Sequence, residues 1–484
     1  MGESRGNPTT AYENFSCCTS TVDTPKHRTS ASNKTVAMSS AKPEVAFLGL
    51  GAMGFGMATH LVKQGYRVTG FDVWATVLDK FKAAGGETAA TAAEAARGKL
   101  YCVCMVATAQ QAQDVLLDGD APAAPALPRG ATVLLCSTVS CQYVQQLQKQ
   151  LVDAGRGDIH LVDCPVSGGA YRAAEGTLSI MAGATDEALA RGRFLLEEMA
   201  DAQKLYIVKG GLGAGSNMKM CHQVLAANQI LAASEAVGFA THLGLDLAKT
   251  GDAVIRSDAH SWMFGHRLPR ILDPQFQPLV SALTIIVKDT GIITSEARRY
   301  AFPTPMTSAA EQAYLVAVGR GFGPDDDSGM VRLYREGKGK VGAVQGLVRN
   351  EAAKIELVRR LLRGIHLCSA AEALAFSHYL GLDLDQVLDL CVNAAGGSSM
   401  LSACGPGMLE ILRRGGPSET TATGYRLEQV AQELQDAVDE AQRLKAPLIL
   451  GSQALNLIRL VQQHAPPERR STADAAFVVK QWAI

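Results

Sequence analysis

The sequence is short of net charge, of paired cysteines and of long apolar runs, and each shortage excludes something. Its 46 basic and 47 acidic residues leave a net charge of −1, which gives no electrostatic footprint for a nucleic acid or an acidic membrane surface. The 11 cysteines form no CxxC pair and several lie within apolar runs, which favours a reducing, cytoplasmic location over a disulfide framework. Because no uninterrupted run of about 18 apolar residues occurs, we predict no membrane-spanning helix.

Composition and patterning divide the chain of 484 residues into five segments. Residues 1–42 are rich in Ser, Thr, Asn and Pro, so we predict a disordered extension rather than a transit peptide, which the acidic residues within it disfavour. A Rossmann-type doubly wound α/β domain is expected over 43–210 and an all-α domain over 211–335. A glycine-rich linker over 336–350 then leads to a second all-α domain over 351–484.

A dinucleotide-binding motif opens the α/β domain. The buried-strand run Val45–Gly49 leads directly into GLGAMG, and a second strand ends on Asp72, the acidic residue that such a motif requires. The loop would offer its backbone amides to a pyrophosphate; its residues are Gly49, Leu50, Gly51, Ala52, Met53 and Gly54. Asp72 would accept hydrogen bonds from ribose hydroxyls and repel a 2′-phosphate, and no Arg follows it, so NAD is favoured over NADP.

Further strands are expected within 99–106, 131–138, 159–166, 177–184 and 204–208, all in one sheet whose carboxyl ends bind the ligand. Val106 and Thr138 end two of these strands and would lie on the nicotinamide side. Ser167, Gly168 and Gly169 follow a third strand, in a small loop whose free N–H groups and hydroxyl suit a carboxylate. An ordinary turn would explain the same three residues.

The stretch Gly213–Gln223, GAGSNMKMCHQ, marks the change from α/β to helical patterning. Its small residues would let a flat ligand approach the backbone, and Ser216 is expected to be the N-cap of a helix that runs to about Leu243. Lys219, His222 and Gln223 then share one helix face. A surface helix would account for them too, but their place directly after a dinucleotide domain favours a catalytic site.

The helical part of the chain repeats itself. Residues 234–247 return as 371–384, and residues 286–305 return as 430–449. These offsets place Lys219 opposite Glu356 and Lys288 opposite Gln432, so the second copy has lost both lysines. We interpret it as a duplicated, structural domain. The acidic run Asp325–Asp327 lacks the spacing of a calcium loop, and no metal site is predicted.

Four ordered motifs, GLGAMG, DCPVSGG, GxGxxxxK and SWMF, resemble the β-hydroxyacid dehydrogenase family, which includes 3-hydroxyisobutyrate and 6-phosphogluconate dehydrogenases. Within that family, the stretches around them are most similar to L-threonate dehydrogenases. The resemblance implies that Lys219 is the catalytic lysine, assisted by Gln223 and His222, that Ser167–Gly169 bind the substrate carboxylate with Trp262 nearby, and that Lys288 lies beside the cofactor. Gln223 and His260 depart from the residues that the family commonly has there.

These observations predict NAD-dependent oxidation of a small hydroxy acid, such as L-threonate, to its 2-oxo acid. A 3-hydroxyisobutyrate-like dehydrogenase or semialdehyde reductase is an alternative within the class, and a non-catalytic NAD-binding scaffold is an alternative outside it. Family members associate through the helical domain, so we expect either a homo-oligomer or an internal pseudo-dimer in which the second copy takes the place of a partner.

Overall fold

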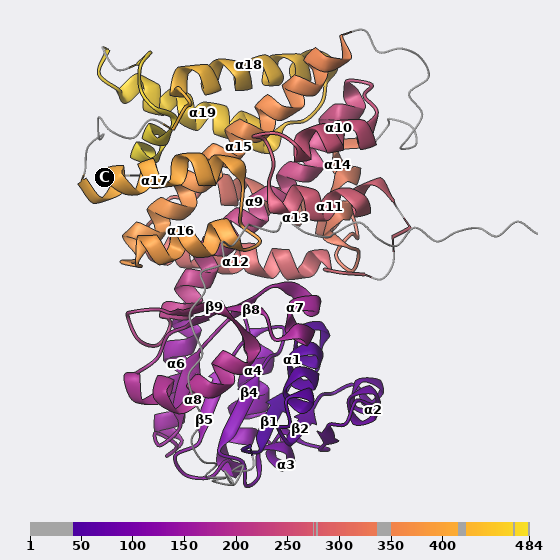
Figure 1. The fold of residues 1–484 in the computed structure, drawn as a ribbon, viewed down its shortest axis with the longest axis vertical. Helices are drawn as coiled ribbons and strands as arrows, with labels where there is room; N and C mark the ends of the chain where they lie inside the picture. The colour runs from indigo at the N-terminus through magenta and orange to yellow at the C-terminus, as the bar shows by residue number, and fades with distance from the viewer. Residues whose placement is uncertain are drawn as a thin grey trace, which may run out of the picture. The chain divides into compact units, whose positions relative to one another are not determined.

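Short and mostly buried runs form a six-stranded parallel sheet in the computed structural model (Figure 1). The structure describes residues 42–273, 275–276, 279–335, 350–414, 423–467 and 470–482. Nearly all of the expected N-terminal extension and of the linker lies outside these residues. The strands are β1 (Val45–Leu48), β2 (Val68–Phe71), β3 (Glu87–Thr88), β4 (Tyr101–Cys104), β5 (Thr132–Leu135) and β6 (His160–Asp163). Their order, β3-β2-β1-β4-β5-β6, reverses direction between β1 and β4, where a doubly wound sheet binds its ligand.

Alternate residues of each strand enter two separate cores, because successive strand side chains point to opposite faces. Val45 and Phe47 pack on the side of α1 (Ala52–Lys63) and α8 (Asp186–Met199). Ala46 and Leu48 pack on the other side of the sheet, against a second group of helices. These helices are α3 (Ala92–Ala96), α4 (Ala109–Gln113), η1 (Asp114–Asp118), α5 (Ala123–Ala126) and α6 (Cys141–Asp153). Helix α2 (Ala75–Ala83) follows β2 and carries only one buried side chain, Phe81. The predicted fold class is confirmed.

The last strands of this domain do not join the large sheet, contrary to our expectation. They form a separate three-stranded sheet with β7 (Val166–Ser167), β8 (Leu178–Ala182) and β9 (Ala200–Ile207), and α7 (Gly169–Glu175) lies between the first two. Pro165 follows β6 and has no N–H to continue a ladder, so the chain leaves the large sheet there. A single antiparallel bridge between Asp163 and Gly183 joins the two sheets.

The first helical copy is built around α9 (Ala214–His242). This is the one helix of the described residues that is long and apolar enough to cross a membrane, but 94% of its most apolar window is buried by the rest of the protein. It is therefore a core helix. The remaining elements of this copy are α10 (Leu247–Ile255), α11 (Trp262–Leu272), α12 (Leu283–Arg299), α13 (Pro305–Gly319), η2 (Asp327–Val331) and α14 (Arg332–Arg335).

The second helical copy repeats this order, except that α14 has no counterpart among its described residues. Its elements are α15 (Glu351–Tyr379), α16 (Leu384–Asn393), α17 (Ser399–Arg414), α18 (Leu427–Leu444), α19 (Ile449–His464) and η4 (Ala475–Gln481). Helices α9 and α15 have 29 residues each and pack against each other in the centre of the helical part (Figure 1). The two copies thus share one continuous hydrophobic core.

Contacts between the copies are reciprocal. Glu235 of α9 accepts hydrogen bonds from the N-terminal amides of α19, while Glu372 of α15 accepts them from the N-terminal amides of α13. Ser261 and Ser398 precede equivalent helices and pair with each other in an isolated antiparallel bridge. This is the pattern of an isologous two-fold interface, here formed within one chain.

Candidate functional site

The glycine loop after β1 has the geometry of a dinucleotide cradle. Gly49 has a φ of +93°, and a Cβ on it would lie 2.3 Å from the Met105 carbonyl oxygen. A Cβ on Gly54 would lie 2.0 Å from the Gly49 oxygen, so this residue is needed for the close turn. Gly51, which precedes α1, faces open space instead, with no protein atom within 4 Å of the position of a Cβ. That space, beside the unpaired first-turn amides of α1, fits a pyrophosphate.

Asp72 ties the end of β2 to this loop. Its Oδ2 accepts a hydrogen bond from Leu50 N at 2.7 Å, and its Oδ1 accepts one from Trp74 N at 3.0 Å. Each carboxylate oxygen retains a lone pair that a ribose hydroxyl could use. Val73 and Trp74, directly after it, are exposed, with 78% and 69% of their surface accessible. The nucleotide side of the loop is therefore open and carries one fixed negative charge.

The carboxyl ends of the neighbouring strands β4 and β5 are joined by a hydrogen bond, and a second bond ties β5 to a helix. The Ser137 hydroxyl accepts a hydrogen bond from Val106 N at 2.9 Å, and the Thr138 carbonyl accepts one from Lys288 Nζ at 3.0 Å. Lys288 lies on α12, so this second bond connects the α/β domain directly to the first helical copy.

The N-terminus of α9 is held in a way that the sequence did not predict. The N-cap is Gly213, with a φ of +91°, and Ser216 lies inside the first turn rather than at the cap. Asp163, at the end of β6, accepts hydrogen bonds from both the amide and the hydroxyl of Ser216 at 2.7 Å. A carboxyl group from a distant strand thus replaces the expected side-chain cap. Burial raises the pKa of Asp163 to about 7, although its hydrogen bonds to Ser216 oppose this rise.

The small residues of this stretch serve packing rather than the approach of a ligand. A Cβ on Gly213 would lie 2.3 Å from the sulfur of Cys141, and a Cβ on Gly215 would lie 2.3 Å from the Met181 oxygen. The helix therefore starts in direct contact with α6 and with the three-stranded sheet. This contact fixes the position of the residues one turn later, including Lys219.

Lys219 is buried without a partner. Only 6% of its surface is accessible, and its amine makes no hydrogen bond or ion pair within the part of the chain that the structure describes. Burial lowers the pKa of Lys219 to about 8; the negative charge of Asp289 acts against this lowering, and the positive charge of Lys288 adds to it. An amine in this environment exchanges a proton near neutral pH, as a general base must.

Next to Lys219, four side chains are linked by two hydrogen bonds and one ion pair. Gln223 donates from Nε2 to Asp289 Oδ2 at 2.6 Å, and the other oxygen of Asp289 is ion-paired with Lys288 at 3.0 Å. Gln223 Oε1 lies 3.0 Å from Nδ1 of His222, which is fully buried. Asp289 was not among the site residues that we predicted from the sequence. Its position directly after Lys288 was the only feature of the sequence that could have indicated a role in the site.

The remaining predicted residues lie apart from this network. Ser167 ends β7 and is 6% exposed, and Gly169 has a φ of +74° and open space around it. No hydrogen bond joins Ser167, Gly168 or Gly169 to Lys219 within the described ranges. Trp262, at the start of α11, is 38% exposed and stacks on His266 with ring centroids 4.5 Å apart.

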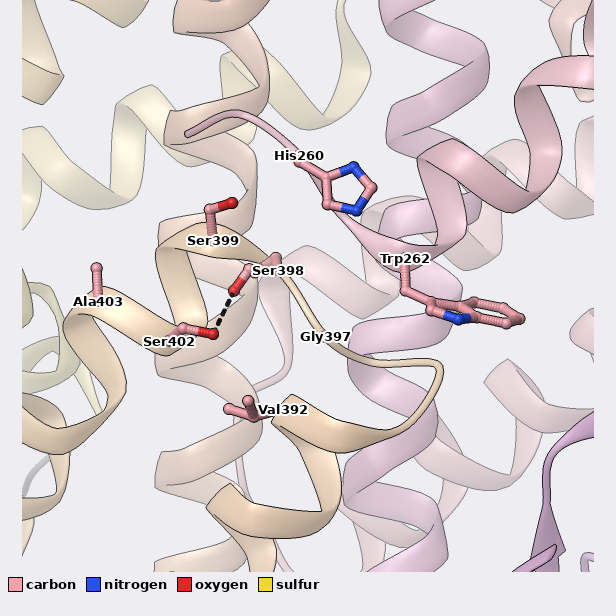
Figure 2. Close-up of a pocket in the computed structure, with 8 residues that line it drawn as sticks. All are labelled: His260, Trp262, Val392, Gly397, Ser398, Ser399, Ser402 and Ala403. Atoms are coloured by element: carbon pink, nitrogen blue, oxygen red, sulfur yellow. Dashed lines mark hydrogen bonds between the residues drawn. The ribbon is translucent and has the colours of Figure 1, made fainter. Parts of the chain in front are cut away.

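A cavity of about 610 Å³ lies between the two helical copies, beside Trp262. Figure 2 shows that His260 and Trp262 border it from the first copy, and that the start of α17 borders it from the second. Its lining is mostly polar or small: His260, Trp262, Val392, Gly397, Ser398, Ser399, Ser402 and Ala403. The Nδ1 atom of His260 is buried and unpaired within the described part of the protein.

The equivalent positions of the second copy are occupied differently. Glu356 stands opposite Lys219, and Glu433 stands opposite Asp289. The buried guanidinium of Arg363 binds both carboxylates at 2.7 Å, and also Asp258 of the first copy at 3.0 Å. Arginine is always protonated, so this cluster contains no proton acceptor of the kind that Lys219 provides.

Comparisons with known proteins agree with this geometry. Residues 44–210 match the NAD binding domain of 6-phosphogluconate dehydrogenase. Residues 213–334 and, separately, 351–478 match the NAD-binding domain of NADP-dependent 3-hydroxyisobutyrate dehydrogenase. The chain is 36% identical to the L-threonate dehydrogenase of Cupriavidus necator over 60% of its own length and 95% of that enzyme's.

Two solved structures resemble different portions of the chain. The 3-hydroxyisobutyrate dehydrogenase of Salmonella typhimurium is 32% identical, with a TM-score of 0.56 over 60% of this chain and all of that one. The 6-phosphogluconate dehydrogenase of Plasmodium falciparum is only 14% identical but covers 88% of this chain and 94% of its own, with a TM-score of 0.61, and so shares the fold across both helical copies. The chain belongs to the β-hydroxyacid dehydrogenase family and is a nicotinamide-dinucleotide-dependent hydroxyacid dehydrogenase.

Proposed function

We propose that this enzyme oxidises a four-carbon sugar acid such as L-threonate to its 2-oxo acid, with NAD as the cofactor. The observation that carries this proposal is the buried, unpaired amine of Lys219 beside the ion pair of Lys288 and Asp289. The nicotinamide, when bound, accepts a hydride from the carbon that bears the substrate hydroxyl. The similarity to L-threonate dehydrogenases supports the choice of acid.

Lys219 acts as the general base. Its neutral amine takes the proton of the substrate hydroxyl as the carbonyl forms, and in the reverse direction its ammonium returns that proton. A pKa of about 8 leaves a useful fraction of the amine unprotonated at neutral pH, whereas an unperturbed lysine, with a pKa near 10.4, would be almost wholly charged. Gln223 lies one helical turn further on and contributes a hydrogen bond to the reacting oxygen or to the acid.

The substrate carboxylate binds at Ser167, Gly168 and Gly169. The Ser167 hydroxyl has no hydrogen-bond partner in the described residues, and the positive φ values of the two glycines turn the backbone sharply after it. Trp262 would lie near the rest of the substrate. Lys288, bonded to Thr138 after the carboxyl end of β5, lies on the nicotinamide side of the site.

NAD is preferred to NADP because Asp72 holds a negative charge where a 2′-phosphate would lie. Its two hydrogen bonds to Leu50 and Trp74 keep the carboxylate at the loop. The next residues, Val73, Trp74 and Ala75, offer no guanidinium to pair with a phosphate. The first turn of α1 contributes the backbone amides of Ala52 and Met53 to the pyrophosphate.

The second helical copy is a duplicated, non-catalytic domain that takes the place of a partner subunit. The reciprocal contacts of Glu235 and Glu372 support an internal pseudo-dimer, and the Arg363 cluster supports the loss of a second active site. A chain that ends near Tyr334 would then expose the face that α15 covers, and should aggregate or self-associate. If that shorter chain stayed monomeric and active, the second copy would have no such role.

The experiment is a substrate panel. NADH formation would be measured with L-threonate, D-erythronate, 3-hydroxyisobutyrate and 6-phosphogluconate, each with NAD and with NADP. Turnover with a four-carbon sugar acid and NAD is the expected result. Preference for 3-hydroxyisobutyrate would favour the semialdehyde-type alternative, and binding of NAD without turnover of any acid would favour a scaffold.

A further inference from the structure

One loop of the second helical copy is hydrogen-bonded to the active-site network. We define the copy-two loop as Ala394–Ser398, which connects α16 to α17. Gly396 N lies 3.1 Å from Nε2 of His222, and the Gly396 oxygen accepts a hydrogen bond from Gln229 Nε2 at 2.7 Å. The Gly397 oxygen accepts one from Trp262 N at 2.8 Å. The loop is therefore fixed to the first copy at consecutive peptide groups.

The contact with Gly396 determines where His222 carries its proton. A backbone N–H can only donate, so Nε2 of His222 must be the acceptor and Nδ1 must carry the hydrogen. Burial lowers the pKa of His222 to about 3, so the ring stays neutral. The Nδ1–H group then donates to Gln223 Oε1 at 3.0 Å. Both ring nitrogens are used, and neither is left for the substrate.

The orientation of His222 in turn decides that of Gln223. With Oε1 engaged by His222, the amide nitrogen of Gln223 faces Asp289 and donates to it at 2.6 Å. A flipped amide would place its oxygen against a carboxylate, which is repulsive. Asp289 is thereby held against Lys288, which binds the Thr138 carbonyl. One chain of polar contacts runs from the second copy to the carboxyl end of β5.

We propose that the copy-two loop is a positioning element of the active site, acting through His222 and Gln223 on the Lys288–Asp289 pair beside Lys219. This inference rests on the proposed function of Lys219. It gives the duplicated domain a role in catalysis beyond filling an interface, and makes His222 a positioning residue. The loop needs glycine here, because a Cβ on Gly396 would lie 3.1 Å from Leu225 Cβ and one on Gly397 would lie 2.7 Å from the Val392 oxygen.

Three variants of the full-length chain test this. His222→Phe keeps an aromatic ring but removes both hydrogen bonds, whereas His222→Asn can still donate to Gln223. Gln229→Met releases the copy-two loop without touching the histidine. Glu372→Gln, a buried contact between the copies outside the network, is the control.

We expect His222→Phe to lower kcat by roughly 10- to 100-fold, which corresponds to about 1.4–2.7 kcal/mol, with little change in KM. His222→Asn should recover part of this loss, because it can still donate to Gln223. Nitrogen NMR of the histidine-labelled protein without cofactor should show the Nδ1–H tautomer for His222 in the wild type and in Glu372→Gln. That signal should be lost or exchange-broadened in Gln229→Met, whose kcat should also fall.

An unchanged kcat in His222→Phe, or an Nε2–H tautomer in the wild type, would overturn the inference. An equal loss of kcat in His222→Phe and His222→Asn would overturn it as well, because a loss of side-chain packing would then be enough to explain both variants. Failure of the proposed function looks different, since the wild type itself would then turn over no hydroxy acid while its NMR tautomer was unaffected.

Discussion

Glu235 and Glu372 occupy equivalent positions in the two helical copies, and each is bound by the N-terminus of a helix from the other copy. Glu235 accepts hydrogen bonds from Ile449, Leu450 and Gly451 N and from the Tyr334 hydroxyl. Glu372 accepts them from the Met306 and Thr307 amides and from the Thr307 hydroxyl. The duplicated halves are thus joined by two buried carboxyl groups.

These two carboxyls should make the stability of the protein fall with rising pH. Burial raises the pKa of each to about 7, despite the hydrogen bonds that oppose the rise, against about 4.3 for an unfolded glutamate. The folded state therefore binds more protons between these values, and stability is lost as pH rises from about 4 through about 7. Thermal unfolding between pH 5 and pH 8 should show a falling Tm.

The double variant Glu235→Gln/Glu372→Gln supplies the control for this slope. It removes both ionisable groups while keeping acceptors for the helix amides. Its Tm should depend less on pH over the same interval, whatever its absolute value. A slope identical to that of the wild type would show that other groups, such as the buried Asp163, are responsible.

Substitutions that remove the charge of Lys288 or of Asp289 should shift the pH profile of the oxidation rate in opposite directions. The rate rises with pH as Lys219 loses its proton, toward a plateau above about pH 8. Removing the positive charge in Lys288→Met should raise the pKa of Lys219 and move the profile to higher pH, by about 1 unit. Asp289→Asn should lower that pKa and move the profile to lower pH. Shifts of the same sign in both variants would contradict these assignments.

Gly51 and Gly54 provide a matched pair in the nucleotide loop. Gly51→Ala places its methyl group in open space, so the protein should keep its Tm but bind NADH at least tenfold more weakly, because the methyl group would meet the pyrophosphate. Gly54→Ala should lower the Tm, since its methyl group would collide with the Gly49 oxygen. Isothermal titration and thermal unfolding separate these effects. Unchanged NADH affinity in Gly51→Ala would place the pyrophosphate elsewhere.

Asp72→Ser tests the cofactor preference. Removing the carboxylate removes the repulsion of a 2′-phosphate, so the ratio of kcat/KM for NAD to that for NADP should fall about tenfold or more. Because Leu50 and Trp74 lose their acceptor, some loss of stability is expected too. An unchanged ratio would mean that Asp72 does not select the cofactor.

Local pattern was sufficient to predict the fold and the family. The buried strand before GLGAMG, the acid at Asp72 and the helix that carries Lys219 are encoded in contiguous residues, and the strands and core helix lie where the periodicity indicated. The two repeated stretches, at offsets of 137 and 144 residues, likewise predicted two helical copies with equivalent elements. These features depend on neighbours in the chain, which the sequence presents directly.

Features that depend on distant contacts were missed. Ser216 resembled an N-cap, but Asp163 supplies that function from another strand, and the glycines near it pack against protein rather than a ligand. His222 shares the helix face of Lys219, yet both of its nitrogens are used by Gln223 and by Gly396 of the second copy. No periodicity in a single sequence reports which backbone amide will meet a given side chain after folding.

The most direct test of Lys219 as the base is the steady-state rate of Lys219→Ala with the acid that the wild type prefers. NADH binding should be retained, because the lysine is separate from the nucleotide loop, while kcat should fall by about 100- to 10,000-fold. The residual rate of the variant should also no longer increase as the pH is raised to 8. A variant that keeps the wild-type kcat and pH profile would contradict the assignment of Lys219 as the catalytic base.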